Sequence, residues 1–95
     1  MKPLRVGIIG AGKIAQKLHA PGFKAAQGCV LSAVCSGSIK KAHSFSDKFD
    51  IPFIFPNYKF MIASGSVDAV AICTPNYLHA PAALYALTHG VHVFV

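Results

Sequence analysis

Acidic side chains are scarce in this sequence of 95 residues. The carboxylates are Asp47, Asp50 and Asp68, whereas Lys and Arg together number nine, so the formal net charge is +6. Such an excess suits nucleic acid, but the basic residues form no run and no nucleic-acid-binding motif is present. We therefore expect no nucleic-acid partner. An anionic small ligand accounts for part of the charge, and solvated surface positions account for most of the lysines.

The sequence also lacks an apolar run long enough to span a membrane, although 54% of its residues are hydrophobic. Charged residues such as Lys13 and Asp68, together with Gly and Pro, interrupt the apolar stretches. The first residues resemble the start of a signal peptide, but Gly10 and Gly12 cut the apolar segment short. We expect no membrane partner and a cytoplasmic location.

Metal-binding and disulfide patterns are absent as well. The cysteines, Cys29, Cys35 and Cys73, lack CxxC spacing and fall in or beside segments with the character of buried strands. They are typical of small core residues in a reducing compartment. The five histidines lack the spacing of a zinc site, so we expect no metal.

The most informative stretch is residues 6–15, Val-Gly-Ile-Ile-Gly-Ala-Gly-Lys-Ile-Ala. An apolar, strand-like run leads into Gly-x-Gly-x-x-Ala and then into a helical pattern. Gly10 would allow a tight turn, Gly12 would let a pyrophosphate approach the backbone, and Ala15 would let the helix pack closely on the strand. The N–H groups at the helix start would attract phosphate. The motif predicts a dinucleotide site, and a purely structural turn is the alternative.

Strand-like and helical segments alternate along the whole sequence. The expected strands are 4–9, 30–35, 53–55, 67–73 and 91–95; the expected helices are 13–19, 21–26 (closed by Gly28), 40–49, 58–63 and 79–88. Ala42, Phe45 and Phe49 form an apolar stripe on the third of these helices. The alternation predicts an α/β protein with a parallel sheet and right-handed crossovers, folded as one domain.

The segment after the second expected strand carries no carboxylate. A site that prefers NAD usually has an Asp or Glu there, which binds the ribose 2′-hydroxyl. Residues 36–41 read Ser-Gly-Ser-Ile-Lys-Lys instead, and hydroxyls, backbone N–H groups and a lysine suit a 2′-phosphate. This favours NADP as the cofactor, with NAD as the alternative. A helix N-cap at Ser38 with solvated lysines is a plainer interpretation that is compatible with it.

Five segments match a known family in order and spacing. They are Gly10-Ala11-Gly12-Lys13-Ile14-Ala15, Ala33-Val34-Cys35-Ser36, Lys41-Ala42, Val67-Asp68-Ala69-Val70 and Thr74-Pro75-Asn76-x-x-His79. The sequence resembles the Gfo/Idh/MocA oxidoreductases, which include glucose-fructose oxidoreductase and inositol dehydrogenase, over essentially all of its length. The resemblance implies a Rossmann-like parallel sheet of about five strands, in the order 3-2-1-4-5, with helices on both faces.

The resemblance also implies three groups of cofactor contacts, to the pyrophosphate, to the adenosine 2′-phosphate and to the nicotinamide ribose. These are Gly10, Gly12, Lys13 and Ile14 for the first, Ser36 and Lys41 for the second, and Thr74, Asn76 and His79 for the third. Gly37 departs from the family, because many relatives have Arg there. Without the resemblance, Asn76 and His79 could simply shape a turn and a helix start.

Members of this family continue after the last matching strand into Glu-Lys-Pro, whose lysine lies at the reacting centre, and later into a substrate-binding domain. The sequence given ends at Val95, before that position. We expect residues 1–95 to be the incomplete NAD(P)-binding domain of an oxidoreductase that acts on a sugar, a polyol or a related hydroxylated substrate. They would bind cofactor without catalysis, carry no catalytic residue, and form homo-oligomers through the exposed last strand. The alternatives are a non-catalytic NADP-binding or redox-sensing module and a truncated interaction protein.

Overall fold

A computed structural model describes residues 2–13, 15–74 and 79–94. Its elements are β1 (Leu4–Ile9), the π-helix η1 (Ala15–His19), α1 (Ala20–Ala25), β2 (Cys29–Cys35), α2 (Ile39–Phe49), β3 (Phe53–Phe55), α3 (Tyr58–Ala63), β4 (Ala69–Ile72), α4 (His79–Thr88) and β5 (His92–Phe94). Every strand pair is parallel, and the strands lie in the order β3-β2-β1-β4-β5. The predicted fold class and strand order are confirmed.

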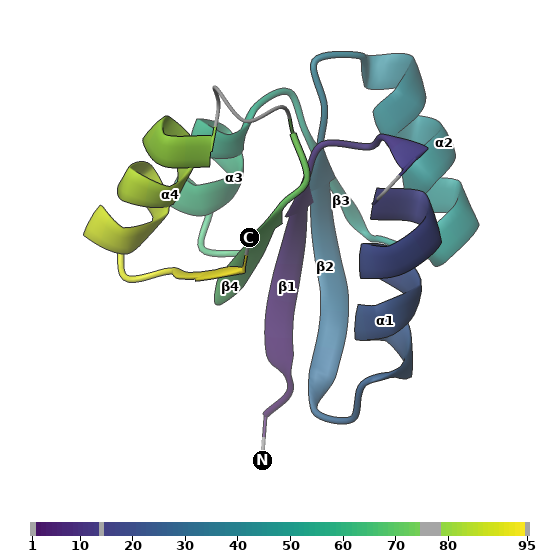
Figure 1. The fold of residues 1–95 in the computed structure, drawn as a ribbon, viewed down its shortest axis with the longest axis horizontal. Coiled ribbons are helices and arrows are strands. Elements are labelled where there is room, and N and C mark those ends of the chain that lie inside the picture. The colour runs from purple at the N-terminus through teal and green to yellow at the C-terminus, as the bar shows by residue number, and fades with distance from the viewer. Residues whose placement is uncertain (1, 14, 75–78, 95) are drawn as a thin grey trace.

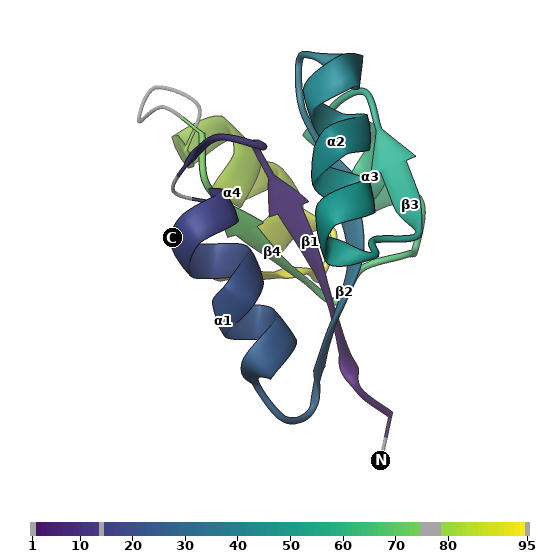
Figure 2. The ribbon, with the colours of Figure 1, turned by 90° about the vertical axis from the view of Figure 1, so that its right-hand side faces the viewer.

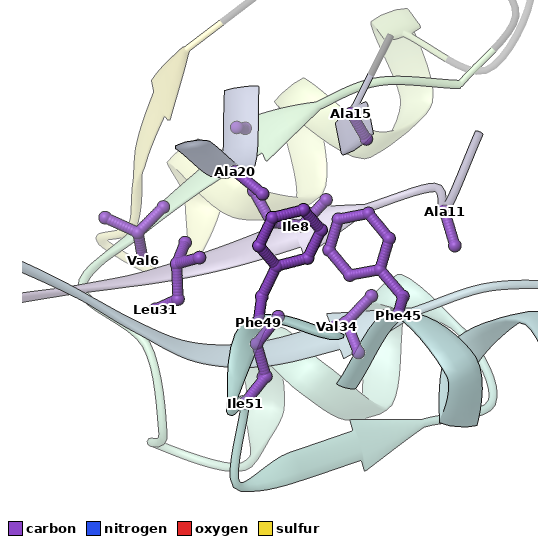
Figure 3. Close-up of a cluster of buried hydrophobic side chains, with 11 residues drawn as sticks. Val6, Ile8, Ala11, Ala15, Ala20, Leu31, Val34, Phe45, Phe49 and Ile51 are labelled. Carbon is purple, nitrogen blue, oxygen red and sulfur yellow. The ribbon is translucent and has the colours of Figure 1, made fainter. Parts of the chain in front are cut away.

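Helices cover both faces of the sheet, with α1 and α2 on one side and α3 and α4 on the other (Figure 1). In the view turned by 90°, α1 and α2 lie in front of the sheet (Figure 2). On this side, Phe45 and Phe49 of α2 pack at a ring-centroid separation of 4.9 Å. They lie over Ile8 of β1 and Val34 of β2 (Figure 3). The predicted stripe on α2 is confirmed, because its aromatic side chains form the centre of this core.

The opposite core requires a glycine in the central strand. A Cβ atom on Gly7 would lie 2.5 Å from Sδ of Met61 and 2.9 Å from Cγ1 of Val67. Met61 and Ile62 of α3 are buried there, and Tyr58 is half-buried. The missing side chain therefore lets α3 pack close to β1.

A bulge in β2 fixes which residues face which core. Val6 pairs with Leu31 and Gly7 pairs with Ala33, so Ser32 is the extra residue. Its buried hydroxyl donates to the carbonyl oxygen of Ser66 at 2.9 Å. Because the bulge shifts the alternation by one position, Leu31 faces the same core as residue 34.

The first helix differs from the prediction. Two separate pieces were expected, but η1 continues directly into α1. Pro21 has no N–H and its ring crowds the carbonyl four residues earlier, and the widened π turn lies immediately before it. Gly28 was expected to close this helix, which is wrong. The C-cap is Ala26, with extended φ −74° and ψ 131°, whereas Gly28, with φ 83°, lies in the turn into β2.

Smaller differences concern strand ends and cysteines. The strands β4 and β5 are shorter than predicted by one or two residues at each described end, within the usual uncertainty of such boundaries, and Val95 lies outside the described residues. Cys35 is a buried core residue as expected, whereas Cys29 and Cys73 are only half-buried; all three are free. Among the described residues, no helix combines the length and apolar character of a membrane span.

Candidate cofactor-binding site

A cavity of about 460 Å³ opens at the carboxyl ends of four strands. Its lining comes from the segments that follow β1, β2, β3 and β4, namely Ile9, Gly10, Ala11, Gly12, Cys35, Ser36, Gly37, Lys41, Pro56, Asn57, Tyr58, Cys73 and Thr74. The central strand β1 lies between β2 and β4. After β1, the chain first forms β2 and β3 on one side of it and then forms β4 and β5 on the other side. Such a switch point is where open parallel sheets bind ligands.

The turn after β1 is tied to both neighbouring strands. Gly10 donates its N–H to the carbonyl oxygen of Cys35 at 2.9 Å, and Cys73 donates to that of Ile9 at 2.8 Å. Gly10 has φ 101°, a conformation that favours glycine. At Gly12, an added Cβ atom would meet nothing within 4 Å. The turn thus leaves its backbone open on the cavity side, as a closely approaching phosphate requires.

The helix that follows the turn packs closely on the sheet. Ala15 is fully buried, and the N–H of Gln16 donates to the carbonyl oxygen of Gly12 at 3.1 Å. Lys13 is exposed and does not line the cavity. The predicted contact at Ile14 lies outside the described residues.

The segment after β2 brings two hydroxyls beside a lysine. Ser36 Oγ accepts from the N–H of Ser38 at 3.2 Å, and Ser38 Oγ accepts from the N–H of Lys41 at 3.3 Å. In both bonds the serine is the acceptor, which leaves its O–H available to donate to a ligand. Ser36 and Lys41 line the cavity together, and none of its lining residues is acidic. This side of the cavity therefore suits an anion.

The segment after β4 carries an unusual threonine. Thr74 lines the cavity, and its buried Oγ1 has no hydrogen-bond partner among the residues that the structure describes. His79, at the start of α4, lies with Nε2 2.6 Å from the carbonyl oxygen of Thr74, and it is not among the lining residues. The predicted contact at Asn76 lies outside the described residues.

Sequence reasoning missed the wall formed after β3. Asn57 Oδ1 accepts from the N–H of Phe60 at 3.1 Å and caps α3. Tyr58 stacks edge-on against Tyr85 of α4, with ring centroids 5.9 Å apart. An Asn before a helical segment signals a cap. Its place in the cavity depends on the pairing of β3 with β2, which local sequence does not reveal.

Two of the residues that line the cavity, Cys35 and Cys73, carry thiols. Burial raises the pKa of Cys35 to about 12, although the N–H of Gly10 opposes the shift. Burial also raises the pKa of Cys73 to about 11. Both side chains are therefore neutral near pH 7 and add no charge to the site.

Residues 4–95 match the oxidoreductase family with an NAD-binding Rossmann fold, Gfo/Idh/MocA. The chain belongs to this family. Since the match covers nearly the whole sequence and includes the cavity, the described residues form the NAD(P)-binding Rossmann domain of this oxidoreductase family.

The individual relatives are longer proteins, and the chain matches only part of each. D-glucoside 3-dehydrogenase from Escherichia coli K12 is 35% identical over 91 residues, which are 96% of this chain and 26% of the relative. A 3-ketoreductase from Actinomadura kijaniata, solved with NADP, is 31% identical with a TM-score of 0.92, covering 98% of this chain and 28% of that one. Scyllo-inositol dehydrogenase from Lactobacillus casei, solved with NAD(H), is 26% identical with a TM-score of 0.91, covering 98% and 27%. The chain thus spans about a quarter of their length.

Proposed function

We propose that residues 1–95 bind NADP in preference to NAD, as the cofactor-binding domain of an oxidoreductase acting on a sugar, a polyol or a related hydroxylated substrate. The observation that carries the cofactor preference is the pairing of Ser36 and Lys41 in one cavity wall without any carboxylate. A ribose 2′-phosphate would receive hydrogen bonds from the serine and charge from the lysine. The sugar or polyol class is supported by similar proteins that are a D-glucoside 3-dehydrogenase and a myo-inositol 2-dehydrogenase.

The cofactor would lie across the strand ends. Its pyrophosphate would meet the backbone at Gly10 and Gly12, with Lys13 and Ile14 at the start of the following helix. The adenosine 2′-phosphate would lie at Ser36 and Lys41. The nicotinamide half would extend towards Thr74, in the segment that also contains Asn76 and His79. We also propose a cytoplasmic location, because the three cysteines of the domain are free, as is usual in a reducing compartment.

The bound nicotinamide would exchange a hydride with a substrate carbon. That reaction requires a substrate held against the nicotinamide ring, whereas the cavity residues would contact only the cofactor. We therefore expect the 95 residues by themselves to bind cofactor and to leave sugars and polyols unchanged. A mixture of the domain, NADP and candidate substrates should form no reduced cofactor.

Calorimetric titration with NADPH and NADH tests the cofactor preference. The domain should bind NADPH more tightly, and Lys41→Ala should weaken NADPH binding while leaving NADH binding unchanged. Lys40→Ala is the matched control, because Lys40 neighbours Lys41 on α2 but does not line the cavity. Equal affinities for the two cofactors would keep a dinucleotide site and remove the 2′-phosphate assignment.

We also propose that two copies associate through β5. In the described part of the chain, β5 forms one edge of the sheet, and an unpaired strand edge is a template for another strand. Phe94 on this strand is 43% exposed, and Leu84 and Leu87 of the neighbouring α4 are more than 60% exposed. Apolar side chains beside an open edge favour a homo-oligomer.

A further inference from the structure

The side chain of Gln16 reaches back to the glycine turn. Gln16 is the second residue of η1, and its Nε2 donates to the carbonyl oxygen of Ala11 at 3.3 Å. The backbone N–H of the same residue donates to the carbonyl oxygen of Gly12 at 3.1 Å. One residue therefore binds two successive carbonyl groups of the turn.

Helix geometry leaves the Ala11 carbonyl to this side chain. A backbone N–H binds the carbonyl four residues earlier in an α-helix and five residues earlier in a π-helix. The N–H of Gln16 takes the nearer carbonyl, that of Gly12, although Gln16 lies in the π-helix η1. The carbonyl five residues earlier, that of Ala11, is bound by the side-chain amide instead. Because a carbonyl can only accept, the amide nitrogen is the donor in this bond.

The peptide group between Ala11 and Gly12 is held on two sides. Ala11 is 6% exposed, and it belongs to the core on the α1 and α2 side of the sheet (Figure 3). Its carbonyl is held by Gln16. The described peptide bonds are trans, and in a trans peptide the C=O and the N–H point in opposite directions. The N–H of Gly12 therefore points away from the Gln16 amide.

This orientation leaves the N–H of Gly12 available to a ligand. In the described part of the chain, no carbonyl oxygen accepts a hydrogen bond from it. Ala11 and Gly12 both line the cavity, and an added Cβ atom at Gly12 would meet nothing within 4 Å. A backbone N–H attracts a phosphate, whereas a carbonyl oxygen turned the same way would repel it. The orientation of this one peptide group therefore decides whether the turn can bind an anion.

We propose that Gln16 is a positioning residue, which holds the Ala11 carbonyl and so keeps the N–H of Gly12 directed at the pyrophosphate of the bound dinucleotide. The inference rests on the proposed cofactor function and adds to it a residue that touches no ligand. Gln16 does not line the cavity, so it acts only through the peptide group between Ala11 and Gly12.

The experiment removes the donor and compares ligands with and without a pyrophosphate. Gln16→Met keeps the length of the side chain and loses its N–H groups. Calorimetric titration should show NADPH and NADH binding weakened roughly fivefold, as the loss of about one hydrogen bond predicts. Binding of adenosine 2′-monophosphate, which has no pyrophosphate, should stay within about twofold of the unmodified domain in an NMR titration.

Gln27→Met is the matched control. Gln27 is exposed in the turn before β2 and lies outside the cavity lining. This variant loses the same side-chain amide at a position that has no contact with the glycine turn. It should bind all three ligands as the unmodified domain does.

Three further measurements separate positioning from a merely structural role. The amide hydrogen of Gly12 should shift strongly when NADPH binds to the unmodified domain and little when it binds to Gln16→Met. In a Gly12→Ala background, Gln16→Met should cost little further affinity, because both changes act through one contact. In the unmodified domain, the side-chain amide hydrogens of Gln16 should exchange with solvent more slowly than those of Gln27.

Each contrary result has a distinct meaning. Undiminished NADPH affinity in Gln16→Met, or equal exchange of the Gln16 and Gln27 amides, would overturn the inference and leave the cofactor site in place. Equal losses for NADPH and adenosine 2′-monophosphate, or additive losses in the Gly12→Ala background, would overturn the positioning role. A folded, unmodified domain that binds no dinucleotide would overturn the proposed function and this inference with it.

Discussion

Gly10 and Thr74 lie so close together that position 10, in the turn after β1, cannot accept a side chain without displacing its neighbours. A Cβ atom on Gly10 would be 2.9 Å from Cγ2 of Thr74 and 3.1 Å from the carbonyl carbon and oxygen of Cys73. The glycine turn and the segment after β4 therefore form one packed unit. Gly10 and Thr74 both line the cavity, so a change on either side of the contact affects the site.

Substitution of Gly10 should affect mainly stability, whereas substitution of Gly12 should affect mainly ligand binding. Gly10→Ala should lower the free energy of unfolding by about 2 kcal/mol or more, because of its φ of 101° and the clash with backbone. Gly12→Ala should change stability by less than about 0.5 kcal/mol, since its Cβ atom enters open space. It should nevertheless weaken dinucleotide binding, because that space is where the pyrophosphate would approach.

Urea unfolding and calorimetric titration measure both effects. If Gly10→Ala is as stable as the unmodified domain, the turn does not require glycine at that position. If Gly12→Ala binds NADPH with undiminished affinity, the pyrophosphate does not lie against Gly12.

The ion pair between Arg5 and Asp68 should make stability depend on pH in acid. Hydrogen bonds from the Arg5 side chain, at 2.9 and 3.1 Å, and from its backbone N–H lower the pKa of Asp68 to about 2 from 3.8. A lowered folded-state pKa means that this stabilisation is present above pH 3.8 and is lost as the pH falls towards 2. The effect should be small, because the side chains are 45% and 38% exposed.

The urea midpoint of unfolding, followed from about pH 5 to about pH 2, tests this dependence. The difference between the unmodified domain and Asp68→Asn should shrink as the pH falls. Asp47→Asn is the control for the loss of a carboxylate, because Asp47 is exposed on α2. A difference that stays constant over this range would contradict the assignment.

The cavity thiols should resist alkylation in the folded domain. Burial raises the pKa of Cys35 to about 12 and that of Cys73 to about 11, and the thiolate is the reactive form. Treatment with iodoacetamide near neutral pH should therefore leave both residues unmodified in conditions that label them in urea. Peptide mass spectrometry reads out each site. Equal labelling of Cys35 in the folded and unfolded protein would contradict its buried position.

Self-association through β5 should be sensitive to charge on that strand. Phe94→Lys should convert oligomers to monomers, because a charged edge strand disfavours pairing. Phe60→Lys is the matched control, since Phe60 is also exposed, at 61%, but lies on α3. Light scattering over a range of concentrations gives the result. Monomers at every concentration in the unmodified domain would exclude the association.

Most element boundaries could be predicted from the sequence, because they follow from local patterns, whereas the strand order was predicted from the family resemblance. The spacing of Phe45 and Phe49 alone placed the buried face of α2. It could not predict the bulge at Ser32 or the fit of Met61 against Gly7. Those features depend on which strands and helices meet in space, and no local pattern contains that information.

The candidate site likewise contains residues that the sequence predicted and residues that it did not. The motif glycines and the serine-lysine segment were visible as patterns, and the structure brings Gly10, Gly12, Ser36, Lys41 and Thr74 to one cavity. The wall after β3 and the hydrogen bond from His79 to the Thr74 carbonyl were not visible. Both depend on contacts between segments that the sequence does not show to be neighbours.

The most direct test of the dinucleotide site is an NMR titration of the ¹⁵N-labelled domain with NADPH. The account predicts that amide shifts concentrate at the carboxyl ends of the strands, at Gly10, Gly12, Ser36, Lys41 and Thr74. It predicts little change at Arg5 and Asp68, which lie at the opposite end of the sheet. Shifts centred on that opposite end, or none at all in a folded sample, would contradict the account.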